Sequence, residues 1–191
     1  MYEFEATADL LFMNPQDAPS NPQSAEAQMV QAVLAGDRDV YGRLYSLYAP
    51  LVHGILLARM PRGEVEDMVQ EIFLHALKKL QTLRDANAFG PWIAMIARNR
   101  AMDFHRQSRQ TVEVTEEIAG SEPGETRAAE ILEVIRSLPE AYSETLVLRL
   151  VEGMTGPEIA LRTGLTPPSV RVNLHRGMKL LRTRFGLQEG L

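Results

Sequence analysis

The chain has 191 residues, of which 45% are hydrophobic and 24% charged, with a formal net charge of −5 and no cysteine. The absence of cysteine excludes disulfides and thiolate zinc sites within the chain. No segment approaches the roughly 18 to 20 consecutive apolar residues of a membrane-spanning helix, and the N-terminus lacks the basic start of a secretory signal. We therefore expect an intracellular, cytoplasmic protein.

The negative charge is concentrated in two segments. Residues 1–24 carry four acidic and no basic residues, and residues 111–126 carry five acidic and no basic residues. The remaining blocks, 25–110 and 127–191, each have a net charge of +2. Each block has the size of a small domain, so the acidic total does not exclude a nucleic-acid partner.

The β-branched residues are dispersed at helical spacing, which predicts an all-α protein of two small helical domains joined by a flexible acidic linker. The expected division is a flexible acidic arm at 1–24, a first domain at 25–108, the linker at 109–126, a second domain at 127–185 and a C-terminal tail at 186–191. In the first domain, apolar periodicity predicts four helices that can bury one core, at about 25–35, 38–60, 63–80 and 88–107.

The third of these helices is amphipathic and has an acidic outer face. Its sequence VEDMVQEIFL, residues 65–74, places Val65, Val69 and Ile72 toward the core at helical spacing. The opposite face carries Glu66, Asp67, Gln70 and Glu71. Taken alone, such a face is most simply a solvated surface.

The fourth helix, FGPWIAMIARNRAMDFHRQSR, has an apolar first half and a basic second half. Trp92, Ile93 and Ile96 recur at helical spacing, and Trp92 is expected in the core rather than stacked on a base. The polar and basic side chains of its later part are Arg98, Asn99, Arg100, Asp103, Arg106 and Arg109.

The second domain contains a pattern typical of a helix-turn-helix. Ser137-x-x-Glu140, with Pro139 in the first turn, predicts one helix start, and Thr155-x-x-Glu158 predicts a capping box for another. Gly164 suits the left-handed residue that ends a helix, and Thr166 then caps a last, basic helix. Along that helix Val170, Leu174, Gly177 and Leu181 can face inward.

Both domains together resemble the extracytoplasmic-function (group IV) sigma factors of bacterial RNA polymerase. The motif from Val65 to Phe73, followed by Trp92-Ile93 and by Ile96 to Asn99 with Asp103, resembles region 2 of that family. Region 4 is matched by Leu138-Pro139-Glu140, Glu152-Gly153, Glu158-Ile159-Ala160, Gly164, Ser169-Val170 and Leu174-His175-Arg176. The two motif sets occur in the family's order on either side of an acidic linker, which is more specific than a helix-turn-helix alone.

The resemblance implies a transcription initiation factor without enzymatic activity, which binds core RNA polymerase and directs it to promoter DNA. The face with Glu66, Asp67, Gln70 and Glu71 is then expected to dock on the polymerase. The loop before the fourth helix and the helix itself are expected to capture the displaced minus-10 strand, because a separated strand needs cations along its phosphates. The expected residues are Asn87, Arg98, Asn99, Arg100, Arg106 and Arg109. Asp103 is expected to orient a neighbouring arginine.

The helix-turn-helix is expected to recognise the minus-35 element as a duplex, because the N-terminal part of a recognition helix meets base edges. The expected base-reading residues are Pro168, Ser169, Arg171, Val172 and Asn173. Further along, Arg176, Lys179 and Arg182 are expected to contact phosphate.

Two other functions fit part of the pattern: a helix-turn-helix regulator that acts without polymerase, and a sigma-like decoy that occupies an anti-sigma factor. By the same resemblance, an anti-sigma factor is an expected partner, often membrane-tethered, which would hold the protein at the inner face of the membrane without insertion. The flexible linker would allow one arrangement with the inhibitor and another on polymerase.

The four histidines show no ligand spacing and the chain no catalytic motif, so neither a metal nor a cofactor is expected.

Overall fold

The computed structural model describes residues 22–110 and 123–186. Residues 1–21, 111–122 and 187–191, which hold most of the predicted arm, linker and tail, lie outside the described residues. Within the described ranges the chain forms only helices and short 3-10 turns, which confirms the all-α prediction.

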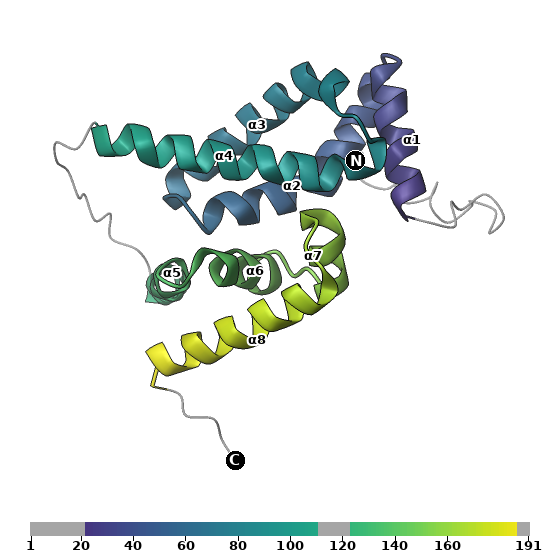
Figure 1. Ribbon diagram of the computed structural model, residues 1–191. Helices are drawn as coiled ribbons and strands as arrows, with labels where there is room; N and C mark the ends of the chain where they lie inside the picture. Colours follow the sequence, from purple (N-terminus) through teal and green to yellow (C-terminus); the bar gives the residue numbers. More distant parts are fainter. Residues whose placement is uncertain (1–21, 111–122, 187–191) are drawn as a thin grey trace, which may run out of the picture.

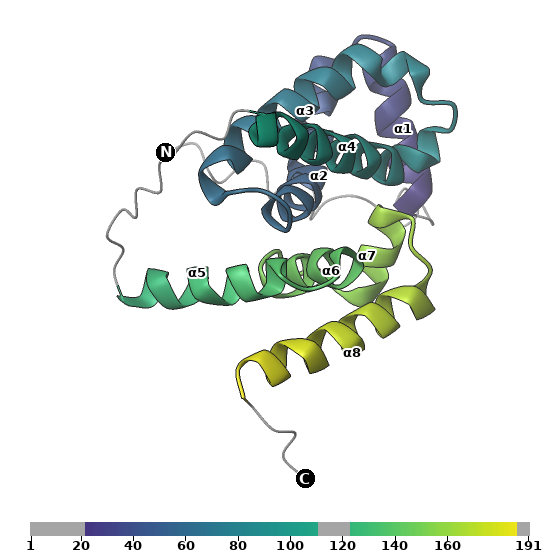
Figure 2. The same ribbon diagram turned by 60° about the vertical axis from the view of Figure 1, so that its left-hand side comes forward.

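The helices form two blocks stacked as layers (Figure 1). The first block contains α1 (Pro22–Leu34), α2 (Arg38–Leu57), η1 (Arg62–Glu64), α3 (Val65–Lys79), η2 (Leu80–Thr82), η3 (Ala86–Ala88) and α4 (Phe89–Gln110). The second contains α5 (Pro123–Arg136), α6 (Glu140–Leu150), α7 (Gly156–Thr163) and α8 (Pro167–Arg184). In the turned view of Figure 2, α1–α4 again lie on one side and α5–α8 on the other.

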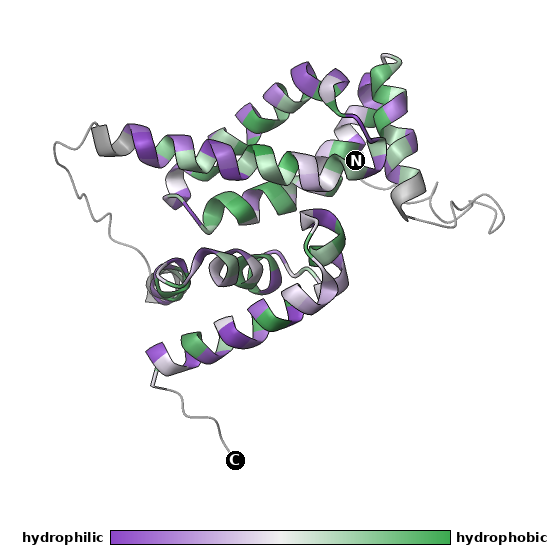
Figure 3. Cartoon of the chain, in the orientation of Figure 1, coloured by the Kyte–Doolittle hydropathy of each residue, from purple (hydrophilic) through white to green (hydrophobic). Residues whose placement is uncertain are grey.

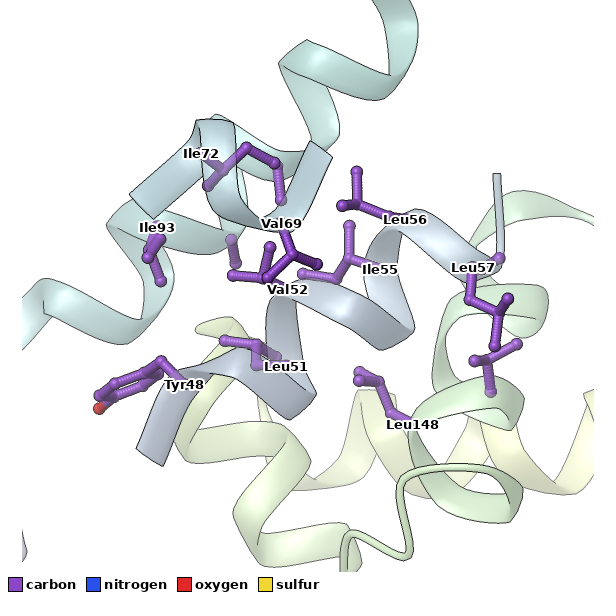
Figure 4. Packing of buried hydrophobic residues seen from close by; sticks show 14 of the residues in the cluster. Tyr48, Leu51, Val52, Ile55, Leu56, Leu57, Val69, Ile72, Ile93 and Leu148 are labelled. Carbon is purple, nitrogen blue, oxygen red and sulfur yellow. The ribbon is translucent and has the colours of Figure 1, made fainter. Parts of the chain in front are cut away.

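Helix α2 is the centre of the packing. Its side chains Leu51, Val52 and Ile55 are fully buried, and α1, α3 and α4 all pack against it. Figure 4 shows Val69 and Ile72 of α3 and Ile93 of α4 pointing toward α2. In Figure 3 the apolar stretches of α2 and α4 alternate with polar ones, as expected for amphipathic helices around a shared core.

The same helix also contacts the second block. Leu148 of α6 is fully buried and lies against the side of α2 that faces away from α3 (Figure 4). Helix α6 packs on α2 and helix α7 packs on α4, so buried side chains of both blocks belong to one hydrophobic cluster. We call this packing of α6 on α2 the closed arrangement.

Several helix boundaries differ from the sequence prediction. Helix α5 begins at Pro123, inside the predicted linker, since proline is accepted in a first turn. The capping box predicted at Ser137 is wrong: Pro139 precedes the first residue of α6, and the Ser137 hydroxyl donates to the Val134 carbonyl at 2.7 Å. A helix that began at Ser137 would have needed helical backbone at Leu138, which a following proline disfavours.

Within the described ranges, no helix combines the length and the apolar character needed to cross a membrane. The same ranges contain no cluster of three His, Asp or Glu side chains able to hold a metal ion.

Candidate nucleic-acid interface

The predicted acidic face lies on the outside of α3. Glu66, Asp67, Gln70 and Glu71 are all exposed, while Val65 and other apolar residues on the opposite side are buried. Leu74, which is 61% exposed, follows on the same face one turn after Gln70. The face therefore offers acidic and apolar side chains together to a partner, and Leu74 is an apolar part of it that the sequence prediction does not include.

The helix-turn-helix has the local geometry that the sequence predicted. The backbone N–H of Thr155 donates to Glu158 Oε2 at 2.8 Å and that of Glu158 to Thr155 Oγ1 at 3.4 Å, which confirms the capping box. The backbone hydrogen bond from Thr155 lowers the pKa of the Glu158 carboxyl. Gly164 is left-handed, with φ of 76°, and Thr166 accepts from the backbone N–H of Ser169 at 3.3 Å.

The recognition helix α8 turns its apolar side toward α6. Val170, Gly177 and Leu181 are buried and Leu174 is half-buried, as predicted. Gly177 permits a close approach there, because a Cβ at this position would lie 3.0 Å from Leu146 Cδ1. The predicted DNA-reading side chains lie on the other side: Pro168, Ser169, Arg171, Val172, Arg176, Lys179 and Arg182 are exposed and Asn173 is half-buried.

The predicted minus-10 residues occupy different environments. The exposed Asn87 is oriented by Asp85, whose Oδ1 accepts from the Asn87 backbone N–H at 2.9 Å and from its side-chain amide at 3.1 Å. Asn99 is exposed and Arg100 half-buried. Arg106 is exposed, and its guanidinium donates to Asp103 at 3.0 Å, in agreement with the orienting role expected of that carboxylate. Arg109 lies in the last turn of α4, where side chains are outside the described residues.

Arg98 differs from the other members of this set, because it points to the second block. Its Nε donates to Glu144 Oε2 at 3.0 Å and its Nη2 to Glu144 Oε1 at 2.7 Å. The hydrogen bond with Glu144 raises the pKa of the guanidinium. In the closed arrangement Arg98 is therefore occupied by a carboxylate of α6.

A second arginine meets the same carboxylate. Arg59, just after the end of α2, donates through Nη2 to Glu144 Oε2 at 2.5 Å and through Nε to Glu140 Oε1 at 2.8 Å. The side chains of Arg59 and Glu144 are only 8% and 6% exposed. Burial alone would raise the pKa of Glu144, but hydrogen bonds from Arg98 and the charge of Arg59 lower it. We call Arg59, Arg98 and Glu144 the ion-pair cluster.

Further polar contacts join the blocks, and three of them come from Arg136, Arg162 and His53. Arg136 of α5 donates to the carbonyls of Leu57 and Met60 at 2.8 and 2.6 Å, which satisfies one acceptor in the last turn of α2 and one just beyond it. Arg162 of α7 donates to the Leu47 carbonyl at 3.0 Å.

The third contact joins His53 Nδ1 to Glu152 Oε1 over 2.6 Å, and this hydrogen bond raises the histidine pKa. None of the three contacts is recognisable from the sequence, because no local pattern links residues that lie about 80 to 115 positions apart.

Family models match both blocks. A model of Sigma-70 region 2 matches residues 44–111, and a model of Sigma-70, region 4, matches residues 128–181. Together they span well over half of the chain.

Curated relatives match over most of the chain. The RNA polymerase sigma factor CarQ of Myxococcus xanthus is 29% identical over 79% of this chain and 92% of its own length. The ECF RNA polymerase sigma factor BldN of Streptomyces coelicolor is 28% identical over 81% of this chain, which spans only 63% of the length of BldN.

Two solved structures share the fold. CnrH, in a complex with the cytosolic domain of CnrY, covers 86% of this chain with a TM-score of 0.62 at 20% identity, and 99% of CnrH is matched. RpoE of Bartonella quintana, in a complex with the anti-sigma factor NepR, covers 78% of this chain with a TM-score of 0.54 at 15% identity, and 98% of its length is matched.

Proposed function

The chain belongs to the extracytoplasmic-function group of the sigma-70 family, and from this premise we propose how its surfaces bind core RNA polymerase and promoter DNA. The observation that carries the proposal is that two separate faces are exposed on two different blocks. One is the acidic and apolar face of α3, and the other is the basic side of the capped helix α8.

The α3 face, with Glu66, Asp67, Gln70 and Glu71, is the proposed docking surface for polymerase. Its acids suit a basic partner, and Leu74 adds apolar area at the centre of a contact, where charge alone gives little affinity. All of these side chains are exposed in the closed arrangement, so the face is accessible there, although Glu66 lies 3.6 Å from Nε2 of His53, the residue that joins Glu152 across the blocks.

The exposed side chains of α8 are the proposed reader of the minus-35 duplex. Ser169 and Arg171 lie in its first two turns, where a recognition helix meets base edges, and Lys179 and Arg182 lie further along, where phosphates are reached. The domain of residues 25–108 would bind the minus-10 strand through Asn87, Asn99 and the arginines of α4.

An anti-sigma factor is the proposed regulator. The solved RpoE that shares the fold is in a complex with the anti-sigma factor NepR. The surfaces between the two blocks, together with the α3 face, are the places where such a partner would prevent polymerase binding. This control would place the protein in the cytoplasm, at the membrane only through its partner.

Run-off transcription with purified core polymerase tests the proposal. Template-length transcript from a promoter selected by sequencing the DNA bound to the holoenzyme is the expected result. A helix-turn-helix regulator would bind duplex DNA but yield no transcript, and a decoy would bind only the anti-sigma factor.

A further inference from the structure

Two arginines of the first block converge on one carboxylate of the second. Arg59 follows α2 and Arg98 lies on α4, and both donate to the buried Glu144 of α6 at 2.5 to 3.0 Å. The arginines thus belong to one block and their shared counter-ion to the other.

The positions of both arginines are fixed by their own block. Arg59 donates through Nη1 to the Ile55 carbonyl at 2.9 Å, one turn back on α2. Arg98 follows directly on the fully buried Ala97, which anchors α4 in the core. The backbone positions of both arginines would therefore be kept if α6 moved away, and their side chains could still reach one shared anion, as both now reach Glu144 Oε2.

Separation of the blocks would leave both cations without a carboxylate. Among the described residues, the carboxylates within 4 Å of Arg59 and Arg98 are Glu140 and Glu144, and both belong to α6. Two adjacent guanidinium groups repel each other and favour a new anion. A phosphate diester suits them, because its oxygens accept the paired N–H donors of arginine as a carboxylate does.

The surroundings favour nucleic acid as the source of that phosphate. A cleft of 560 Å³ lies between the blocks: Arg59 and His105 line it from the first block, and Arg136, Glu133 and Glu140 line it from the second, so that of these five only Arg59 and His105 would stay in place on separation. Arg98 lies on the same helix as the exposed Asn99 and Arg106, which are proposed to bind the displaced strand. A strand that followed these side chains along α4 would bring a phosphate to Arg98 and its neighbour Arg59.

We propose that Arg59 and Arg98 form a binding site for a backbone phosphate of single-stranded DNA, and that Glu144 occupies this site in the closed arrangement. The proposal rests on the proposed function of the first domain and deepens it: Arg59 joins the minus-10 surface, and Glu144 of region 4 competes with the strand. Binding of the strand and closure of the blocks therefore exclude each other.

Binding of a fluorescein-labelled 15-nucleotide oligothymidine to the full-length protein, followed by anisotropy over a series of salt concentrations, tests the site. Glu144→Gln removes the competing charge and is expected to raise affinity by about threefold or more, as a charge-assisted bond is lost from the closed form. The matched control Glu130→Gln, on an exposed position of α5, loses the same charge and should bind as the unchanged protein.

The decisive variant adds Arg59→Ala to Glu144→Gln. The gain in affinity should disappear, and the slope of log affinity against log salt should fall by about 0.7, the value for one phosphate contact on a single strand. Arg59→Lys in the same background should retain the slope, because the charge is kept, and thermal melting by circular dichroism identifies any variant that fails to fold.

Equal affinity and slope with and without Arg59 would overturn the site, and so would an unchanged affinity of Glu144→Gln. These outcomes are distinct from a failure of the proposed function. A protein that gives no run-off transcript lacks sigma activity, whereas one that transcribes but shows no Arg59 dependence lacks only this phosphate site.

Discussion

A methyl group added at Gly54 tests the closed arrangement without changing any charge. Gly54 lies in α2, where α6 crosses it, and a Cβ there would be 2.7 Å from Leu148 Cδ2 and 2.9 Å from Glu152 Cγ. Gly42 lies earlier in the same helix, and a Cβ there would meet no atom within 4 Å. Gly42→Ala is therefore a matched control for Gly54→Ala.

The two substitutions should have opposite effects. Replacing glycine by alanine inside a helix stabilises it by about 0.8–1 kcal/mol, and Gly42→Ala should show this gain. At Gly54 the same gain is opposed by overlap, because carbon atoms in contact lie about 3.5–4.0 Å apart and Leu148 is fully buried. Overpacking costs about 1–3 kcal/mol, so the net effect should be a loss of up to about 2 kcal/mol or a separation of the blocks.

Urea unfolding and a label-to-label distance measure these effects. The chain has no cysteine, so Gln81→Cys and Thr183→Cys, both exposed, place one spin label on each block. Gly54→Ala should lower the urea midpoint, lengthen the mean distance between labels, or do both, while Gly42→Ala should raise the midpoint at constant distance. If Gly54→Ala stabilises the protein as much as Gly42→Ala and the distance stays constant, the contact of α2 with α6 does not form in solution.

Three other predictions concern the proposed surfaces. Reversing the charge of Asp67 and Glu71 to Lys should abolish binding of core polymerase in a pull-down assay while duplex promoter binding persists; retained polymerase binding would refute the docking face. Lys179→Ala should weaken duplex binding for all sequences alike and lower the salt slope by about 0.9, whereas a loss confined to one promoter would make it a base reader. The hydrogen bond that His53 donates to Glu152 raises the pKa of His53, so the contribution of this bond to closure is complete below the unfolded value of about 6.5 and is lost as pH rises through the higher folded value. The label distance should therefore lengthen as pH rises above about 6.5, by an effect of at most about 1 kcal/mol, and His53→Gln should abolish this change.

Features that depend on local sequence were predictable. The α3 face follows from helical periodicity over ten residues, and the capping box from the three-residue spacing of Thr155 and Glu158. Gly164 was identified because few other residues accept a left-handed conformation. At Ser137 the same reasoning was wrong, since a following Leu138-Pro139 pair overrode a capping pattern that was otherwise complete.

The contacts between the blocks were not predictable in this way. Glu144 resembles an ordinary surface charge in its own helix, and its partners Arg98 and Arg59 lie 46 and 85 positions earlier in the chain. The family resemblance, together with the basic character of α4, predicts that Arg98 binds DNA, and nothing in that helix indicates that it meets a carboxylate. Such pairing depends on how the helices pack, which is set by the whole buried surface and not by any one segment.

The composition of the interface determines how easily the blocks can separate. A buried ion pair gains little net stability, since the attraction of Glu144 for its arginines is offset by the loss of water around all three groups. Affinity between the blocks must then come mainly from apolar contacts such as that of Leu148 with α2. If a partner pulls α6 away, Arg59 and Arg98 lose their carboxylate and regain an anion only by binding another ligand. If instead one residue of the ion-pair cluster is substituted in the closed arrangement, the other charged groups stay buried without a partner. The ion-pair cluster thus contributes little to the affinity of the two blocks for each other. It contributes much to the choice of ligand, because an anion that binds Arg59 and Arg98 stabilises the separated form.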